Sequence, residues 1–174
     1  MMRLFIAINF DDEIKDYICK VIQSVKNHAI KGNFTRRENY HLTLVFIGET
    51  KNIDNAKHAI DIIDAKPFEL CIAGLGKFKR AGGDIYWLDV QKNRSLEQIY
   101  KKLFNELLKE GFKLDNREHK PHLTLGRELI LDSDFDINKY KDLSVKTRVE
   151  RISLMKSERI AGKLIYTEVY AKNL

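Results

Sequence analysis

The sequence has only two cysteines, and none of its apolar stretches approaches the length of a membrane span. Cys19 and Cys71 lie far apart among apolar residues, which argues against a disulfide framework and indicates buried free thiols in a reducing compartment. A membrane helix needs roughly 18 consecutive apolar residues, and no run reaches that length. The first residues lead directly into a strand pattern without the layout of a signal peptide, so we expect a cytoplasmic protein.

Length and charge narrow the class of protein further. The chain of 174 residues is 44% hydrophobic and 32% charged, which is typical of a soluble globular protein that can form a real core. Its formal net charge of +6 favours an anionic partner but does not identify one, because many basic proteins bind no nucleic acid. No stretch reads as a disordered tail or a low-complexity linker.

Two short stretches share the letters His-Leu-Thr-Leu, at residues 41–44 and 122–125. Side chains alternate between the two faces of a strand, so each stretch places a histidine and a threonine on one face and two leucines toward a core. A repeated tetrapeptide can arise by chance, and half-buried strands with surface His and Thr are common. The four letters alone therefore leave a structural and a functional interpretation open.

The spacing of 81 residues between the two histidines recurs elsewhere in the chain. Shifted by this distance, the strand-like run 3–9 falls on another such run at 84–90, and a helical pattern follows each of them. The run 68–75 likewise falls on 149–156. Chance would not align several elements at one spacing, so we interpret the chain as two related lobes that present their His-Leu-Thr-Leu strands to one cleft.

The pattern as a whole predicts an α+β fold with antiparallel or mixed sheets, because helical stripes interleave with strands and tight strand pairs. We expect one two-lobed domain over residues 1–174. Lobe one comprises about 1–81 plus the C-terminal strand, and lobe two comprises about 82–162. Within them, the first helix is predicted to begin at Asp11 or Asp12 and to end at Gly32, and a later helix is predicted to start with a capping box of Ser95 and Gln98.

Two loops and one long strand are also predicted. The loop 76–83 is rich in glycine and carries three basic residues and Phe78, which suits a nucleic-acid backbone and a stacked base, although a solvated hairpin loop is the simpler interpretation. Residues 34–38 are predicted to form a polar loop, and 145–155 a single strand.

The chemistry of paired His-x-Thr strands fits displacement at phosphorus. An imidazole has an unperturbed pKa near 6.5, so one histidine can accept a proton while the other donates one. Threonine hydroxyls can donate hydrogen bonds to the phosphoryl oxygens, where charge builds up in the transition state. Such a pair requires neither a metal nor a covalent intermediate. A zinc site is disfavoured because the histidines lack helical pair spacing and no Cys or carboxylate cluster accompanies them.

The two motifs, with their flanking residues Val45-Phe46-Ile47-Gly48 and Gly126-Arg127, resemble those of the two-histidine phosphoesterases. Within that superfamily the chain is most similar to the RNA 2′,3′-cyclic phosphodiesterases, also called 2′-5′ RNA ligases, nearly from end to end. The resemblance implies a bilobal fold with pseudo-twofold symmetry and no cofactor or metal. It also implies opening of a terminal 2′,3′-cyclic phosphate to a 2′-phosphate, and reversible formation of 2′-5′ linkages without ATP.

Carried over by position, the resemblance assigns a role to each motif residue. His41 is expected to be the general acid that protonates the departing 3′ oxygen, and His122 the base that activates water, although the two lobes are too alike for sequence to fix this polarity. Thr43 and Thr124 are expected to bind the phosphate, and Arg127 to add charge-assisted contacts.

Strand alternation conflicts with one of these assignments. Arg127 is five positions after His122, so a regular strand would turn it to the opposite face. We therefore predict an irregular backbone at Gly126 that re-aims Arg127. The same alternation places Phe46 with the core residues.

Further substrate contacts are expected from Lys120, Phe78 and Arg80, and His119 is expected at the edge of the cleft. Tyr86 or Trp87 could stack on a base, with structural packing as the simpler interpretation. The expected partners are RNA ends or small nucleotide 2′,3′-cyclic phosphates, bound by a monomer with neither a membrane nor an obligate protein partner. Two alternatives stay open: a non-catalytic RNA-end or nucleotide-binding module with the same cleft, and a metal-dependent hydrolase.

Overall fold

The apolar run that opens the chain forms the centre of a β-sheet. A computed structural model describes residues 1–116 and 119–174, and in it β1 (Met2–Asn9) lies between two other strands. Five consecutive residues of β1, from Leu4 to Ile8, are buried. A strand covered on both faces needs such an unbroken apolar run, so the sequence of β1 matches its central position.

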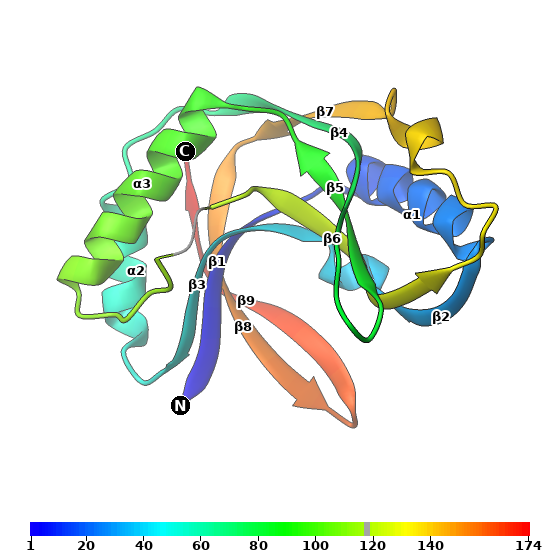
Figure 1. Ribbon diagram of the computed structural model, residues 1–174. Helices are drawn as coiled ribbons and strands as arrows, with labels where there is room; N and C mark the ends of the chain where they lie inside the picture. Colours follow the sequence, from blue (N-terminus) through cyan, green and yellow to red (C-terminus); the bar gives the residue numbers. More distant parts are fainter. Residues whose placement is uncertain (117–118) are drawn as a thin grey trace.

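Two antiparallel sheets make up the body of the protein (Figure 1). The first has the order β3-β1-β8-β9, in which the further strands are β3 (His41–Thr50), β8 (Arg151–Ile160) and β9 (Lys163–Asn173). The second has the order β2-β6-β5-β4-β7, with β2 (Ala29–Phe34), β6 (His122–Leu131), β5 (Asp84–Val90), β4 (Phe68–Phe78) and β7 (Ser144–Val149). The predicted α+β class is confirmed.

The helices pack their apolar stripes against these sheets. The helix α1 (Asp12–Lys26) contacts β2 and β7, whereas α2 (Ile53–Asp61) and α3 (Arg94–Lys109) lie on the side of the first sheet (Figure 1). Asp11 caps α1, as predicted, by accepting a hydrogen bond from the N–H of Ile14 at 2.9 Å. The cap of α3 is Asn93 and not the predicted Ser95, because Ser95 already lies within the first helical turn.

The sheets show how the predicted repeat is arranged. The shift of 81 residues relates β1, β3 and β4 to β5, β6 and β8, and the orders β3-β1-β8 and β6-β5-β4 correspond strand for strand. Each sheet thus takes its third strand from the other half of the chain. The division near residue 81 therefore does not coincide with the division into sheets, since β2 pairs with β6 and β4 pairs with β5.

Two local predictions fail for reasons of long-range pairing. Residues 29–34 form the edge strand β2 where the sequence predicts the end of a helix and the start of a polar loop. Gly32 has φ +134°, and an added Cβ would lie 2.3 Å from a side-chain carbon of Leu129 on β6, so this glycine permits a close strand pairing and does not end a helix. The predicted strand 145–155 is divided at Glu150, where the chain passes from β7 in one sheet to β8 in the other.

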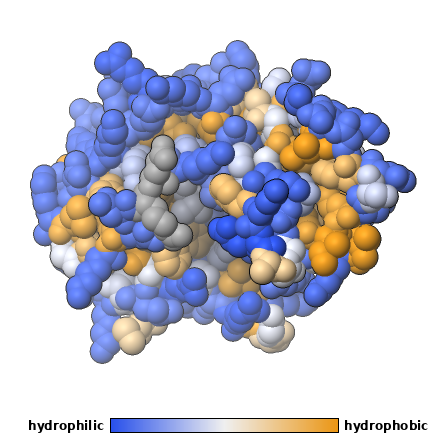
Figure 2. All heavy atoms as spheres, in the orientation of Figure 1, coloured by the Kyte–Doolittle hydropathy of each residue, from blue (hydrophilic) through white to orange (hydrophobic). Residues whose placement is uncertain are grey.

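The surface seen in Figure 2 is mostly hydrophilic, with hydrophobic atoms gathered into smaller patches, a prominent one on the side of α1 and β2. Within the described part of the chain, no helix is both long and apolar enough to cross a membrane.

Candidate active site

Each sheet contributes one strand that begins with a histidine. In β3, His41 and Thr43 are half-buried while Leu42 and Leu44 are buried. β6 repeats the arrangement, with His122 and Thr124 half-buried and both leucines of its motif buried. The alternation predicted from sequence is therefore confirmed for both motifs. The leucines anchor each strand in the core and leave the imidazole and the hydroxyl on the opposite face.

The two imidazoles are held by the same kind of contact. The Nδ1 of His41 lies 2.7 Å from the carbonyl oxygen of Asn39, and the Nδ1 of His122 lies 2.7 Å from that of Lys120. A carbonyl can only accept, so each Nδ1 carries a proton and each Nε2 is left to exchange one. At His41 the Nε2 also lies 2.9 Å from the Oγ1 of Thr43. Both rings are thereby fixed in the tautomer that proton transfer through Nε2 requires.

Aromatic rings surround both histidines. The ring centroid of His41 lies 4.9 Å from that of Phe5 and 5.0 Å from that of Tyr166, which packs edge-on at 88°. The rings of Phe78 and Trp87 lie 5.3 and 5.9 Å from that of His122. Each imidazole is therefore partly shielded from water by a pair of rings.

This enclosure and the neighbouring charges set the protonation of the site. Burial lowers the pKa of His41 and of His122, and the hydrogen bond to a backbone carbonyl partly offsets the effect in each case. The positive charge of Arg127 lowers both pKa values further. A charge on His122 also lowers the pKa of His41. The strands β3 and β6, one from each sheet, contact each other directly, which brings the two histidine motifs to the same region of the molecule.

Arg127 reaches this site because β6 is irregular, as predicted. Gly126 pairs with Tyr86 and Thr124 pairs with Trp87, which leaves Leu125 without a partner in β5 and forms a bulge. The extra residue inverts the alternation beyond it. Arg127 is therefore exposed on the face of His122, and its charge acts on both histidines.

The same bulge occurs at the equivalent position of β3 and overturns one prediction. Val45 pairs with Ile6 and Thr43 with Ala7, so Leu44 has no partner in β1. Beyond the bulge Phe46 is 49% exposed, with the guanidinium of Arg3 5.0 Å from its ring centroid, and it is not the core residue that regular alternation predicts. The prediction fails because the bulge is defined by the pairing of β3 with β1, and the local sequence of β3 does not show that pairing.

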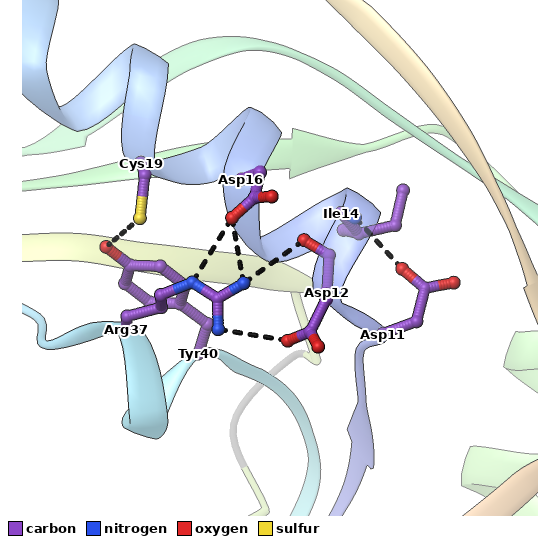
Figure 3. A network of polar contacts seen from close by, with 7 residues as sticks. All are labelled: Asp11, Asp12, Ile14, Asp16, Cys19, Arg37 and Tyr40. Atoms are coloured by element: carbon purple, nitrogen blue, oxygen red, sulfur yellow. Dashed lines mark hydrogen bonds and ion pairs between the residues drawn. The ribbon is translucent and has the colours of Figure 1, made fainter.

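The turn that leads into His41 is anchored on α1 (Figure 3). The guanidinium of Arg37 bonds to Asp12 at 3.0 Å and to Asp16 at 2.8 Å, which are one helical turn apart. The Sγ of Cys19 lies 3.6 Å from the hydroxyl of Tyr40. Each exposed ion pair contributes little free energy. Together the contacts of Arg37 and Tyr40 hold the turn against α1.

Of the further contacts predicted from sequence, two lie beside His122. The Nζ of Lys120 lies 4.3 Å from the ring centroid of Trp87 and 5.8 Å from that of Phe78. Arg80 lies in the turn between β4 and β5, where its N–H donates to Asp84 at 3.2 Å. His119 stacks on Tyr100 with centroids 3.9 Å apart, and its Nε2 lies 3.5 Å from the carbonyl oxygen of Thr43, so it links the segment before β6 to the motif strand β3.

Tyr166 has no role predicted from the sequence, although Ile165-Tyr166 repeats Ile85-Tyr86 at nearly the repeat spacing. Its place beside His41 follows from the pairing of β9 with β8, which no local pattern encodes. Among the residues that the structure describes, no three His, Cys, Asp or Glu side chains are grouped so that they could hold a metal ion.

Two sheets related by a duplication, each presenting a His-x-Thr strand to a shared site, define the class of two-histidine phosphoesterases. The sequence profile of the 2′-5′ RNA ligase superfamily matches residues 12–161. The chain belongs to this superfamily.

Named relatives match over nearly the full length of the chain. An RNA 2′,3′-cyclic phosphodiesterase of Thermotoga maritima is 30% identical over 97% of this chain and 94% of its own. A protein of the same name from Methanocaldococcus jannaschii is 31% identical, over 95% and 96% of the two chains. The structure of E. coli LigT complexed with 3′-AMP is similar with a TM-score of 0.86 at 25% identity, covering 99% of this chain and 98% of that one.

Proposed function

We propose that the protein is a phosphodiesterase that opens 2′,3′-cyclic phosphates at RNA ends to 2′-phosphates. The observation that carries the proposal is the pair of imidazoles from two sheets, each with Nδ1 held by a backbone carbonyl and Nε2 left for proton transfer. The names of the relatives from Thermotoga maritima and Methanocaldococcus jannaschii support the same activity.

The reaction divides its proton transfers between the two histidines. The Nε2 of His122 takes a proton from water as the water oxygen bonds to phosphorus, and the bond from phosphorus to the 3′ oxygen breaks. The Nε2–H of His41 gives its proton to that oxygen, which leaves a 3′-hydroxyl and a 2′-phosphate. The charges beside His122 act on its pKa in opposite directions, since Lys120 lowers it and Asp89 raises it, so the polarity is taken from the position of each motif in the family.

Charge on the phosphate is balanced by groups around the histidines. The hydroxyls of Thr43 and Thr124 donate hydrogen bonds to the phosphoryl oxygens, and Arg127 adds a charge-assisted contact. A bound anion favours the protonated form of a neighbouring imidazole. The substrate itself therefore counteracts the burial that lowers the pKa of His41, and the acid becomes charged when it is needed.

The RNA chain leading to the cyclic phosphate extends along the side of His122 in this proposal. Lys120 and Phe78 lie there, and Arg80 follows at the tip of the hairpin between β4 and β5. With a 5′-hydroxyl in place of water as the nucleophile, the same proton transfers join that oxygen to phosphorus as a 2′-5′ linkage and release the 3′ oxygen as a hydroxyl, and the reverse reaction restores the cyclic phosphate. One chain supplies both histidines, so we expect a monomer to be active, without a metal, on RNA ends in the cytoplasm.

The test is incubation with an RNA that ends in a 2′,3′-cyclic phosphate, in the presence of EDTA. We expect hydrolysis to a 2′-phosphate in wild type and its loss in both His41→Ala and His122→Ala. A 3′-phosphate product would contradict the assigned leaving oxygen. Loss of activity in EDTA with rescue by one metal would indicate a metal-dependent hydrolase, and RNA binding without turnover would indicate a binding module.

A further inference from the structure

Tyr166 of β9 lies against His41, the histidine of the motif strand β3 in the same sheet. Its ring centroid is 5.0 Å from that of His41 and 4.9 Å from that of Phe5, edge-on in both cases. Phe5, Ala7 and Met155 form a small buried cluster on which Tyr166 packs. The ring is therefore held on the same face of the first sheet as His41.

The segment that carries Tyr166 is tied to the turn before His41. The carbonyl oxygen of Leu164 accepts a hydrogen bond from the Nδ2 of Asn39 at 3.0 Å and another from the guanidinium of Arg36. Asn39 is 6% exposed, and its own carbonyl holds the Nδ1 of His41. One buried residue thus fixes both the orientation of the imidazole and the position of β9 two residues before Tyr166.

The hydroxyl of Tyr166 is left available as a donor. Among residues 1–116 and 119–174 the hydroxyl has no hydrogen-bond partner. Its oxygen is also not one of the fully buried polar atoms, so a ligand can reach it. Burial raises the pKa of Tyr166, while the charges of Arg127 and Arg3 oppose this. A phenol with a raised pKa keeps its proton at neutral pH and can donate it to an anion.

The geometry points to Tyr166 as a further catalytic residue, whose hydroxyl donates a hydrogen bond to a phosphoryl oxygen of the cyclic phosphate on the side of His41. This inference rests on the proposed phosphodiesterase activity. The Nε2 of His41 must reach an oxygen bonded to the same phosphorus, and Arg127 attracts the phosphate to the same place. A donor beside His41 therefore meets the phosphate where negative charge builds up.

Tyr166→Phe tests the inference because it removes only the hydroxyl and keeps the ring beside His41. A hydrogen bond to a charged group implies a loss of kcat of about 10- to 100-fold, with a smaller change in KM and an unchanged Tm. The matched control is Tyr170→Phe on the same strand. A bulge in the pairing of β9 with β8 separates the two tyrosines, and the hydroxyl of Tyr170 bonds instead to Asp61 at the end of α2.

Steady-state kinetics on adenosine 2′,3′-cyclic phosphate, with thermal unfolding of the same samples, distinguishes the outcomes. A loss of kcat confined to Tyr166→Phe supports the contact, as does weaker inhibition of that variant by adenosine 2′-phosphate. A Tyr166→Phe enzyme as fast as wild type overturns it, and so does a loss that follows a lowered Tm. An inactive wild type would instead contradict the proposed function and is recognised before any variant is compared.

Discussion

The two histidines are held alike and surrounded differently. Both donate Nδ1–H to the carbonyl two residues earlier, at the same distance of 2.7 Å. His41 then packs against Phe5 and Tyr166, whereas His122 lies beside Trp87 and Phe78 with the cation of Lys120 over the indole ring. The duplicated motif therefore holds both imidazoles in the same way, and the residues around them give the two imidazoles different environments.

The largest effect that would test this comparison comes from removing each imidazole. We expect His41→Ala and His122→Ala each to lower kcat by about 10² to 10⁴, because each proton transfer contributes that much. The double variant should be little slower than the slower single one, since the two groups act as a unit.

An activated phosphodiester with a p-nitrophenolate leaving group separates the two roles. That leaving group needs no proton, so His41→Ala should retain its turnover while His122→Ala should not. The opposite pattern would reverse the assignment of acid and base.

Arg127 links the two environments and carries the next largest effect. Arg127→Ala should lower kcat/KM by about 10- to 100-fold, as expected for a lost hydrogen bond to a charged group. It should also raise the pKa of both histidines, because the guanidinium charge now lowers them. The rising limb of kcat/KM against pH reports the base in the free enzyme and should move to higher pH. Arg148→Ala, on β7 at the edge of the second sheet, is the control, and an equal shift in that variant would count against a local effect.

The sequence predicted those parts of the site that depend on local alternation. His41, Thr43, His122 and Thr124 share a face because buried leucines alternate with them, and this pattern is visible within four residues. The irregular backbone at Gly126 was also predictable, since the glycine sits where the alternation conflicts with the expected role of Arg127. Helical stripes were predicted for the same local reason.

Features that depend on a distant partner were not predictable. The exposure of Phe46 follows from a bulge that is defined only against β1, and β2 forms only because Gly32 lets it approach β6. Tyr166 reaches His41 because Leu164 is bound by Asn39, 125 residues earlier in the chain. Such contacts join segments whose separate patterns carry no sign of the pairing.

A smaller and more local effect tests the surroundings of His122 alone. Gly76 pairs with Trp87, and a Cβ on Gly76 would lie 2.2 Å from the Cη2 of the indole. Gly76→Ala must therefore displace Trp87 or the strand, at a cost of about 1 to 3 kcal/mol in the free energy of unfolding. The Nζ of Lys120 lies over the indole ring, so a displaced ring would also displace Lys120 beside His122. We therefore expect kcat to fall as well. Gly82→Ala is the control in urea unfolding, because nothing lies within 4 Å of its added Cβ; equal losses in both variants would refute the packing argument.

The smallest expected effect is the dependence of stability on pH. The pKa of each histidine is lowered in the folded state, so below an unfolded pKa of about 6.5 the unfolded chain binds more protons than the native one. The stabilising contribution is therefore present above that pH and is lost as the pH falls toward the folded pKa. A difference of one in pKa corresponds to about 1.4 kcal/mol. His41→Asn and His122→Asn should each make the loss of free energy of unfolding below pH 6.5 shallower. Urea unfolding at a series of pH values measures both slopes, and a variant whose stability falls as steeply as that of wild type below pH 6.5 would show that the replaced imidazole is as basic in the folded chain as in the unfolded one.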